Sequence, residues 1–185
     1  MGLGYKAAQS DLQALQKISD RRMIIGVISD THIPVAAAKL PRRLMNRLRG
    51  CDLIVHAGDI TEMSVIECLQ GIAEVRAVSG NMDSMKVKNN LPPRLLFKAD
   101  GKRIGVVHGT GRGSEPLESA KKTFHKCADI IIFGHSHNPV NRTIDGKLYM
   151  NPGSPTDMVF TSYRSFGIIE LNNGGVRSEI IKFED

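Results

Sequence analysis

Seven side chains that can bind a metal ion follow apolar stretches of this sequence. Each stretch is rich in valine and isoleucine, as at residues 24–28, which predicts a buried strand. The carboxyl ends of strands in an open α/β sheet lie at one edge, where ligands bind. We therefore expect all seven side chains to meet there and to bind metal: Asp30, His32, Asp59, Asn81, His108, His135 and His137.

The types of these side chains indicate which metals they would bind. Asp30 and His32 are two positions apart, so on the period of a strand they point to the same side and can reach one ion. Nitrogen and oxygen ligands without thiolate favour transition metals over Ca²⁺ or Mg²⁺. We expect two divalent ions, with Mn²⁺ preferred and Ni²⁺, Zn²⁺, Fe²⁺ or Co²⁺ as alternatives.

Asp59 is the natural ligand to share between two ions, because each carboxylate oxygen can hold one of them. Asp30, His32 and one imidazole of the His135/His137 pair would complete one ion's ligands. Asn81, His108 and the other imidazole would complete those of the second. Two dications outweigh the two carboxylates, so the site would attract an anionic, phosphate-like substrate.

A water shared by two such ions should be ionised at neutral pH, because a single zinc ion already brings its bound water to a pKa of about 7. The resulting metal-bridging hydroxide would attack phosphorus in line. Asp59, Asn81 and His108 are accordingly the predicted catalytic residues.

Composition sets limits on the class of protein. The chain has 185 residues, of which 41% are hydrophobic and 24% charged, as in ordinary globular proteins. Its three cysteines include no C-x-x-C pair, which argues against a disulfide framework and a thiolate zinc site. No apolar run approaches the roughly 20 residues of a membrane helix, and the start of the chain shows no secretory signal. We expect a cytoplasmic protein without membrane association.

The formal charge of +6 makes an anionic partner plausible and leaves nucleic acid open. The densest basic cluster is Arg42, Arg43, Arg47 and Arg49, interleaved with leucines 40, 44 and 48 at helical spacing. This pattern predicts a helix whose arginines face solvent. The aromatic interleaving typical of single-strand binders is missing.

Two parts of the chain are expected. Residues 1–22 would form an N-terminal helical extension, with an amphipathic helix at residues 10–18 that could contact another subunit in a homo-oligomer. Residues 23–185 would form the main domain. Its first half alternates strands and helices, and its second half contains hairpin turns at Asp100-Gly101, Asp145-Gly146 and residues 172–175. This order predicts an α/β fold of two mixed sheets packed face to face, with helices outside.

Five motifs, in order, resemble those of the calcineurin-like metallophosphoesterases, and their spacing is similar to that of the small bacterial and archaeal phosphodiesterase branch. They are Asp30-Thr31-His32, Gly58-Asp59, Gly80-Asn81-Met82-Asp83, His108-Gly109 and Gly134-His135-Ser136-His137. The resemblance implies that residues 23–185 form a metallophosphoesterase domain, a four-layer αββα sandwich with the metals at the sheet edge. It also implies that Asp30, His32, Asp59 and His137 hold one ion, and Asp59, Asn81, His108 and His135 the other.

One position departs from the pattern of the family. Many members carry a histidine after the Gly-Asn pair, where this chain has Met82. In the family, that histidine is thought to protonate the leaving group. Without it, esters with poor leaving groups should react most slowly, so we expect a phosphodiesterase with a small phosphate-ester substrate. A nuclease and a protein-binding scaffold, as in the similar retromer subunit, are the alternatives. His56 and His125 are interpreted as structural, and Asp83 as support for the ligands.

Overall fold

The computed structural model describes residues 22–113 and 115–184. The expected helix at residues 10–18 lies outside the described residues, as does the N-terminal extension apart from Arg22, so the division at residue 22 remains a prediction. The described strands are β1 (Met23–Ile28), β2 (Leu53–His56), β3 (Glu74–Ala77), β4 (Arg94–Ala99), β5 (Lys102–Val107), β6 (Ile130–Ile132), β7 (Val140–Ile144), β8 (Lys147–Asn151), β9 (Arg164–Asn172) and β10 (Gly175–Phe183). The described helices are α2 (Arg42–Leu48), α3 (Met63–Gln70), α4 (Met85–Asn90) and α5 (Glu115–Phe124).

The strands form two five-stranded mixed sheets. The first has the order β10-β9-β1-β2-β3, in which β1, β2 and β3 are parallel and β9 is antiparallel to both β1 and β10. The second has the order β4-β5-β6-β8-β7, with β5, β6 and β8 parallel and the outer strands antiparallel. The predicted α/β fold with two mixed sheets is confirmed.

Alternation along the strands separates the core into layers. In β1, Ile25 and Val27 are fully buried against strands of the second sheet, in a cluster that also contains Ile104 and Ile130. Ile28 belongs instead to a cluster that packs the first sheet against helices α2 and α3. Successive residues of a strand point to opposite faces, so one strand contributes to both clusters.

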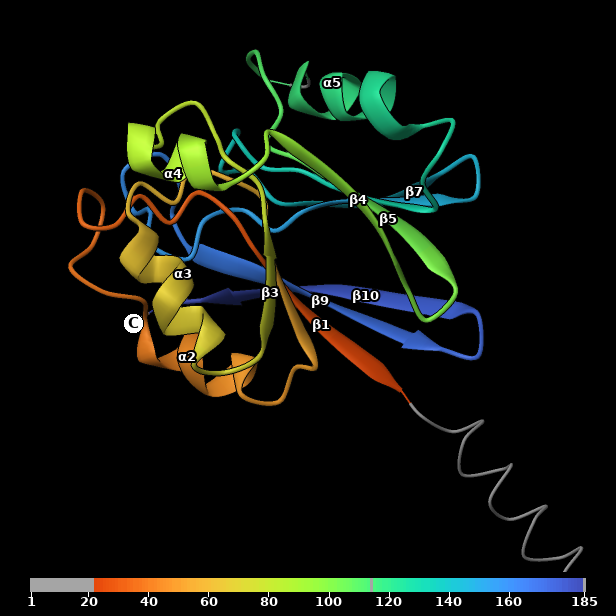
Figure 1. Cartoon of the computed structure of the whole chain (residues 1–185), viewed down its shortest axis with the longest axis horizontal. Helices are drawn as coiled ribbons and strands as arrows, with labels where there is room; N and C mark the ends of the chain where they lie inside the picture. The colour runs from red at the N-terminus through yellow and green to blue at the C-terminus, as the bar shows by residue number, and fades with distance from the viewer. Residues whose placement is uncertain (1–21, 114, 185) are drawn as a thin grey trace, which may run out of the picture.

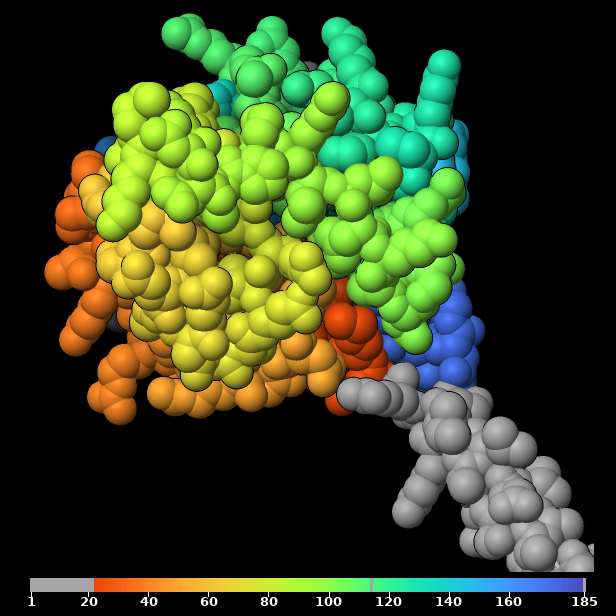
Figure 2. Space-filling model, in the orientation of Figure 1, coloured from red at the N-terminus to blue at the C-terminus, as the bar shows by residue number. Residues whose placement is uncertain are grey.

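A third cluster packs α5 against the outer face of the second sheet, through Ala120, Phe124, Ile131 and Tyr149. Three apolar interfaces therefore separate four layers, which confirms the predicted αββα sandwich. Figure 1 shows α5 on one side of the paired sheets and α2 and α3 on the other. In Figure 2, side chains of the α3–β4 region cover most of the face toward the viewer, and little of β1 reaches that surface.

The Arg-rich helix follows its prediction. Leu44 and Leu48 on α2 are fully buried, and its arginines are exposed. The sequence of residues 61–71 predicts a helix that begins at Thr61, and this predicted start is wrong. Thr61 has a left-handed backbone (φ 76°), and its amide donates to Asp83 Oδ1, so the helix begins at Met63. Helix α4 was not predicted; Ser84 caps it by accepting a hydrogen bond from the Val87 amide.

The three expected hairpins are present, joining β4 to β5, β7 to β8 and β9 to β10. In each turn a non-glycine residue followed by glycine has positive φ, which is the geometry such pairs favour. No helix among the described residues is long and apolar enough to cross a membrane.

Candidate metal centre

The segments that follow five strands join at one edge of the two sheets. The Asp30 amide donates to the Gly58 carbonyl at 2.9 Å, and the His32 amide to the Asp59 carbonyl at 3.0 Å. In the second sheet, the Gly134 amide donates to the His108 carbonyl at 2.9 Å. The two sheets are then linked by the His135 amide, which donates to the Asp30 carboxylate. These hydrogen bonds hold together the segments that carry Asp30, His32, Asp59, His108 and His135.

Five of the seven predicted ligands have a left-handed backbone: Asp30, His32, Asp59, His135 and His137, with φ between 43° and 75°. Residues other than glycine seldom adopt this conformation, and it clusters at functional sites. Asp30 and His32 do converge as expected. The reason differs from the prediction, because a left-handed turn, rather than the period of an extended strand, aims both side chains.

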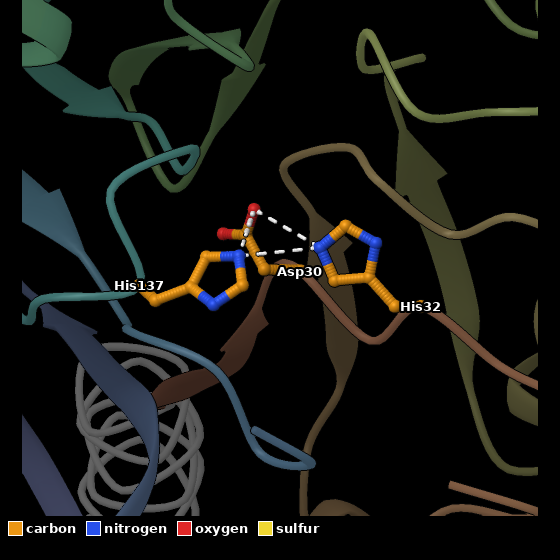
Figure 3. Close-up of side chains that lie close together, drawn as sticks. All are labelled: Asp30, His32 and His137. Atoms are coloured by element: carbon orange, nitrogen blue, oxygen red, sulfur yellow. Dashed lines mark hydrogen bonds and ion pairs between the residues drawn. The ribbon is translucent and has the colours of Figure 1, made fainter. Parts of the chain in front are cut away.

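Asp30, His32 and His137 form the first ligand group (Figure 3). The Nε2 atoms of His32 and His137 are 3.2 Å apart, and Asp30 Oδ1 lies 3.5 Å from His137 Nε2 and 4.0 Å from His32 Nε2. One ligand atom from each residue thus faces a common point. Asp30 is completely buried, and the two imidazoles are partly exposed.

Asp59, His108 and His135 form the second ligand group. His108 Nε2 lies 3.1 Å from Asp59 Oδ2 and 3.2 Å from His135 Nδ1. Asn81 Oδ1 is 2.9 Å from that same His135 nitrogen, so the asparagine lies beside the group. Asp59 Oδ2 is also 3.7 Å from His32 Nε2, which places this carboxylate between the two groups.

Glycines allow the loops to approach the carboxylates. A Cβ atom at Gly80 would overlap the Asp59 carboxylate, and one at Gly134 would overlap the Ser29 hydroxyl. Any larger residue would displace the loop that carries Asn81 or the one that carries His135. Steric contact therefore explains why a glycine precedes each of these two ligands.

Three of the histidines are oriented by an acceptor on their other nitrogen. His137 Nδ1 donates to Asp157 Oδ2 at 2.5 Å, His108 Nδ1 to the Ala57 carbonyl at 2.8 Å, and His135 Nε2 to the Gly111 carbonyl at 2.8 Å. Such partners fix the tautomer and leave the opposite nitrogen free for a metal. The donor set and its orientation fit two divalent ions.

Asp157 was missed from the sequence, because it follows no strand and belongs to no spacing pattern. Ser154 and Thr156 were missed too. Both hydroxyls donate to the Asp30 carbonyl, and that of Thr156 also donates to the Thr31 carbonyl. This buried segment supports the loop that carries Asp30 and His32 from behind.

The residues interpreted as structural have structural partners. His56 is fully buried between Thr31 Oγ1, at 3.0 Å, and the Gly58 amide, at 3.3 Å. His125 Nδ1 lies 2.9 Å from the Tyr149 hydroxyl. Asp83 accepts from the amides of Thr61 and Gly80, both at 2.6 Å, so its carboxylate holds the loop beside Asn81.

Electrostatics differ between the two carboxylates. Burial raises the pKa of Asp30, and the charges of His108 and His137 offset this only in part. Burial also acts to raise the pKa of Asp59, but the hydrogen bond from His108, the charge of that imidazole and the Met82 amide lower it below its usual value. Burial acts to lower the pKa of His108; its hydrogen bond to Asp59 and the nearby carboxylates raise it to about 9. The opposite pKa shifts of Asp59 and His108 favour a charged pair between these two side chains.

Comparison with known proteins places this geometry in a family context. Residues 23–174 match the calcineurin-like phosphoesterase superfamily domain. A probable metallophosphoesterase of Methanothermobacter thermautotrophicus is 34% identical over 161 residues, which cover 86% of this chain and 92% of that protein. A phosphodiesterase of Methanocaldococcus jannaschii is 24% identical, over 86% of this chain and all of that protein.

A solved structure shares the fold. Vps29 from Entamoeba histolytica, in complex with Zn²⁺, superposes with a TM-score of 0.68 and 26% identity, covering 88% of this chain and all of that one. The similarity therefore extends both to proteins named for phosphoester hydrolysis and to one named for vacuolar protein sorting.

Proposed function

The chain belongs to the calcineurin-like phosphoesterase superfamily, and on that basis we propose that it is a phosphodiesterase dependent on two divalent metal ions. The observation that carries this proposal is the position of Asp59, whose Oδ2 lies 3.1 Å from His108 Nε2 and 3.7 Å from His32 Nε2. One carboxylate within reach of both ligand groups suits a pair of ions about 3.5–4 Å apart.

Asp30, His32, Asp59 and His137 would hold one ion, and Asp59, Asn81, His108 and His135 the other. Ions bound there would supply Lewis acidity that polarises the phosphoryl oxygens and activates water for attack on phosphorus. We propose Mn²⁺ as the bound metal, with Ni²⁺, Zn²⁺, Fe²⁺ and Co²⁺ as alternatives.

The chain's own residues would orient and anchor the centre. The acceptors Asp157, Ala57 and Gly111 hold three imidazoles with one nitrogen aimed inward. The buried carboxylates Asp30 and Asp59 supply the negative charge that retains the cations. With only these two carboxylates in the ligand groups, two dications keep an excess of positive charge, which favours a phosphate-ester substrate.

Met82 supports the preference for diesters. Its side chain is 62% exposed, and its amide donates to Asp59 Oδ1 at 2.8 Å. A thioether cannot protonate a leaving alkoxide. Monoesters with poor leaving groups should therefore react slowly, and diesters with good leaving groups should react best.

The test compares bis-p-nitrophenyl phosphate with p-nitrophenyl phosphate, using chelator-treated protein reloaded with each candidate metal. We expect Mn²⁺ to restore hydrolysis and the diester to have the higher kcat/KM. His108→Ala should abolish the activity, whereas the matched control His125→Ala, in a histidine that contacts Tyr149, should retain it. Preferential hydrolysis of the monoester would contradict the proposal.

A protein-binding scaffold is the second candidate, favoured by the structural similarity to Vps29. The two functions differ in what the metals do. A metal-replete protein that hydrolyses neither ester would support the scaffold, whereas metal-dependent turnover lost in His108→Ala would support the enzyme. We also propose a cytoplasmic location and a homo-oligomeric state.

A further inference from the structure

A short apolar loop, residues 158–160, lies directly after Asp157. Its three side chains are solvent-exposed, with Met158 at 48%, Val159 at 85% and Phe160 at 79%. A single exposed apolar side chain is ordinary on a protein surface, but three in succession, one of them aromatic, are informative. Packing of the protein core therefore does not explain why three consecutive apolar side chains of this loop are exposed.

The apolar loop is held in place by the carboxylate that orients a predicted metal ligand. Asp157 Oδ1 accepts from the Val159 amide at 2.7 Å and from the Phe160 amide at 3.2 Å, and Asp157 Oδ2 accepts from His137 Nδ1. The Asp157 amide in turn donates to the buried Ser154 hydroxyl. One side chain thus fixes the loop and the imidazole relative to each other.

The aromatic ring itself touches the first ligand group. The Phe160 and His137 rings are 5.9 Å apart between centroids and meet at 80°, an edge-to-face contact. His137 directs its Nε2 toward Asp30 and His32. A molecule bound at the first ligand group would therefore have an exposed aromatic surface beside it.

We propose that Phe160 is a specificity-determining residue, which packs against a flat organic ring carried by one ester group of the substrate. The inference rests on the proposed function and narrows its substrate class to phosphodiesters with an aryl or nucleobase-bearing group. A ring packed on Phe160 lies next to the ligand group that binds the phosphate, so one substrate can occupy both.

Two further exposed apolar residues stand close in sequence to predicted ligands. Val35, three residues after His32, is 83% exposed, and Met82, next to Asn81, is 62% exposed. Exposed apolar residues therefore also stand close in sequence to a ligand of each group. Such residues suit an anionic phosphorus that carries apolar organic groups.

Binding of two phosphonates tests the inference without requiring turnover. Phenylphosphonate and methylphosphonate carry the same charged group and differ in the ring. We expect the Mn²⁺-loaded protein, measured by calorimetry, to bind phenylphosphonate about fivefold more tightly than methylphosphonate. Phe160→Ala should bring the ratio near one by weakening only phenylphosphonate, and Phe160→Tyr should restore it.

Leu96→Ala is the matched control, because Leu96 is 48% exposed on β4. It should leave the ratio unchanged, and Phe160→Leu serves if the alanine variant misfolds. Equal or undetectable binding of the two phosphonates by the wild type, or a ratio insensitive to Phe160, would overturn the inference and leave the apolar loop to a protein partner. Failure of the proposed function is distinct, since it appears as absent hydrolysis whatever the ratio.

Discussion

The two ligand groups have similar side chains but different supports. In the first group, His137 is oriented by the carboxylate of Asp157, and the Asp30 carboxyl is fully buried with a raised pKa. In the second group, His108 and His135 are oriented by backbone carbonyls, and Asp59 forms an ion pair with His108. The orientation of the first group therefore depends on the Asp157 side chain, which a mutation can change. The orientation of the second group depends on backbone carbonyls, and metal binding there requires His108 to lose a proton.

The largest effect is expected where the two groups meet. Asp59→Asn keeps the shape of the side chain but removes the charge within reach of both, so it should lower kcat/KM by more than the 10–100-fold typical of an outer partner of a ligand. Metal analysis should show both ions weakened. The control Asp100→Asn, in the exposed β4–β5 turn, should bind both normally. Loss of one ion alone would show that the groups are independent.

A smaller effect should separate the groups. Asp157→Asn removes the charged acceptor of His137 Nδ1, so metal affinity of the first group should fall about 10–100-fold, while that of the second stays unchanged. Titration of the metal-free protein with Mn²⁺ would resolve the two affinities. Equal weakening of both sites would contradict the distinction between their supports.

The proton held in the second group predicts a dependence on pH. The pKa of His108 is raised from 6.5 to about 9 in the folded metal-free protein. A raised pKa contributes stability that is complete below about 6.5 and is lost as pH rises through about 9. Unfolding free energies of chelator-treated protein should therefore decline across this range. His108→Gln should remove most of the decline; an unchanged profile would place the proton elsewhere.

Metal binding to the second group should also displace this proton, so affinity for Mn²⁺ should rise with pH up to about 9. Calorimetry in buffers of different ionisation enthalpy would count the protons released at pH 7. His108→Gln should release fewer than the wild type.

The smallest effect concerns His56, whose ring lies 3.0 Å from Thr31 Oγ1 and accepts a hydrogen bond from the Gly58 amide at 3.3 Å. Burial lowers its pKa to about 3, with the charge of His108 acting in the same direction. The ring should therefore stay neutral from pH 5 to 8 in an NMR titration. A lowered pKa in a base means that this residue's contribution to stability is lost as pH falls from 6.5 toward 3. A His56 signal that titrates near 6.5 would show that the ring is not buried as described.

The fold and the grouping of the seven side chains could be inferred from the sequence, because apolar strands and the residues that follow them have a local pattern. Asp30 and His32 were expected to converge, but the left-handed backbone that aims them depends on hydrogen bonds to Gly58 and Asp59, which lie far along the chain. No spacing rule reports such contacts.

The roles of Asp157 and Thr61 were missed for the same reason, because both depend on contacts between residues far apart in the chain. Asp157 supports His137 from a segment without regular structure, and its role depends on a contact between residues 20 positions apart. Thr61 looks like a helix cap in the sequence, but the Asp83 carboxylate holds its amide in a loop instead. Tertiary contacts outweighed local preference at both positions.

The most direct test of the shared centre is anomalous diffraction from crystals grown with Mn²⁺. We expect two ions about 3.5–4 Å apart, one bound by the first ligand group and one by the second, with Asp59 touching both. A single ion, or two ions that do not share Asp59, would contradict it.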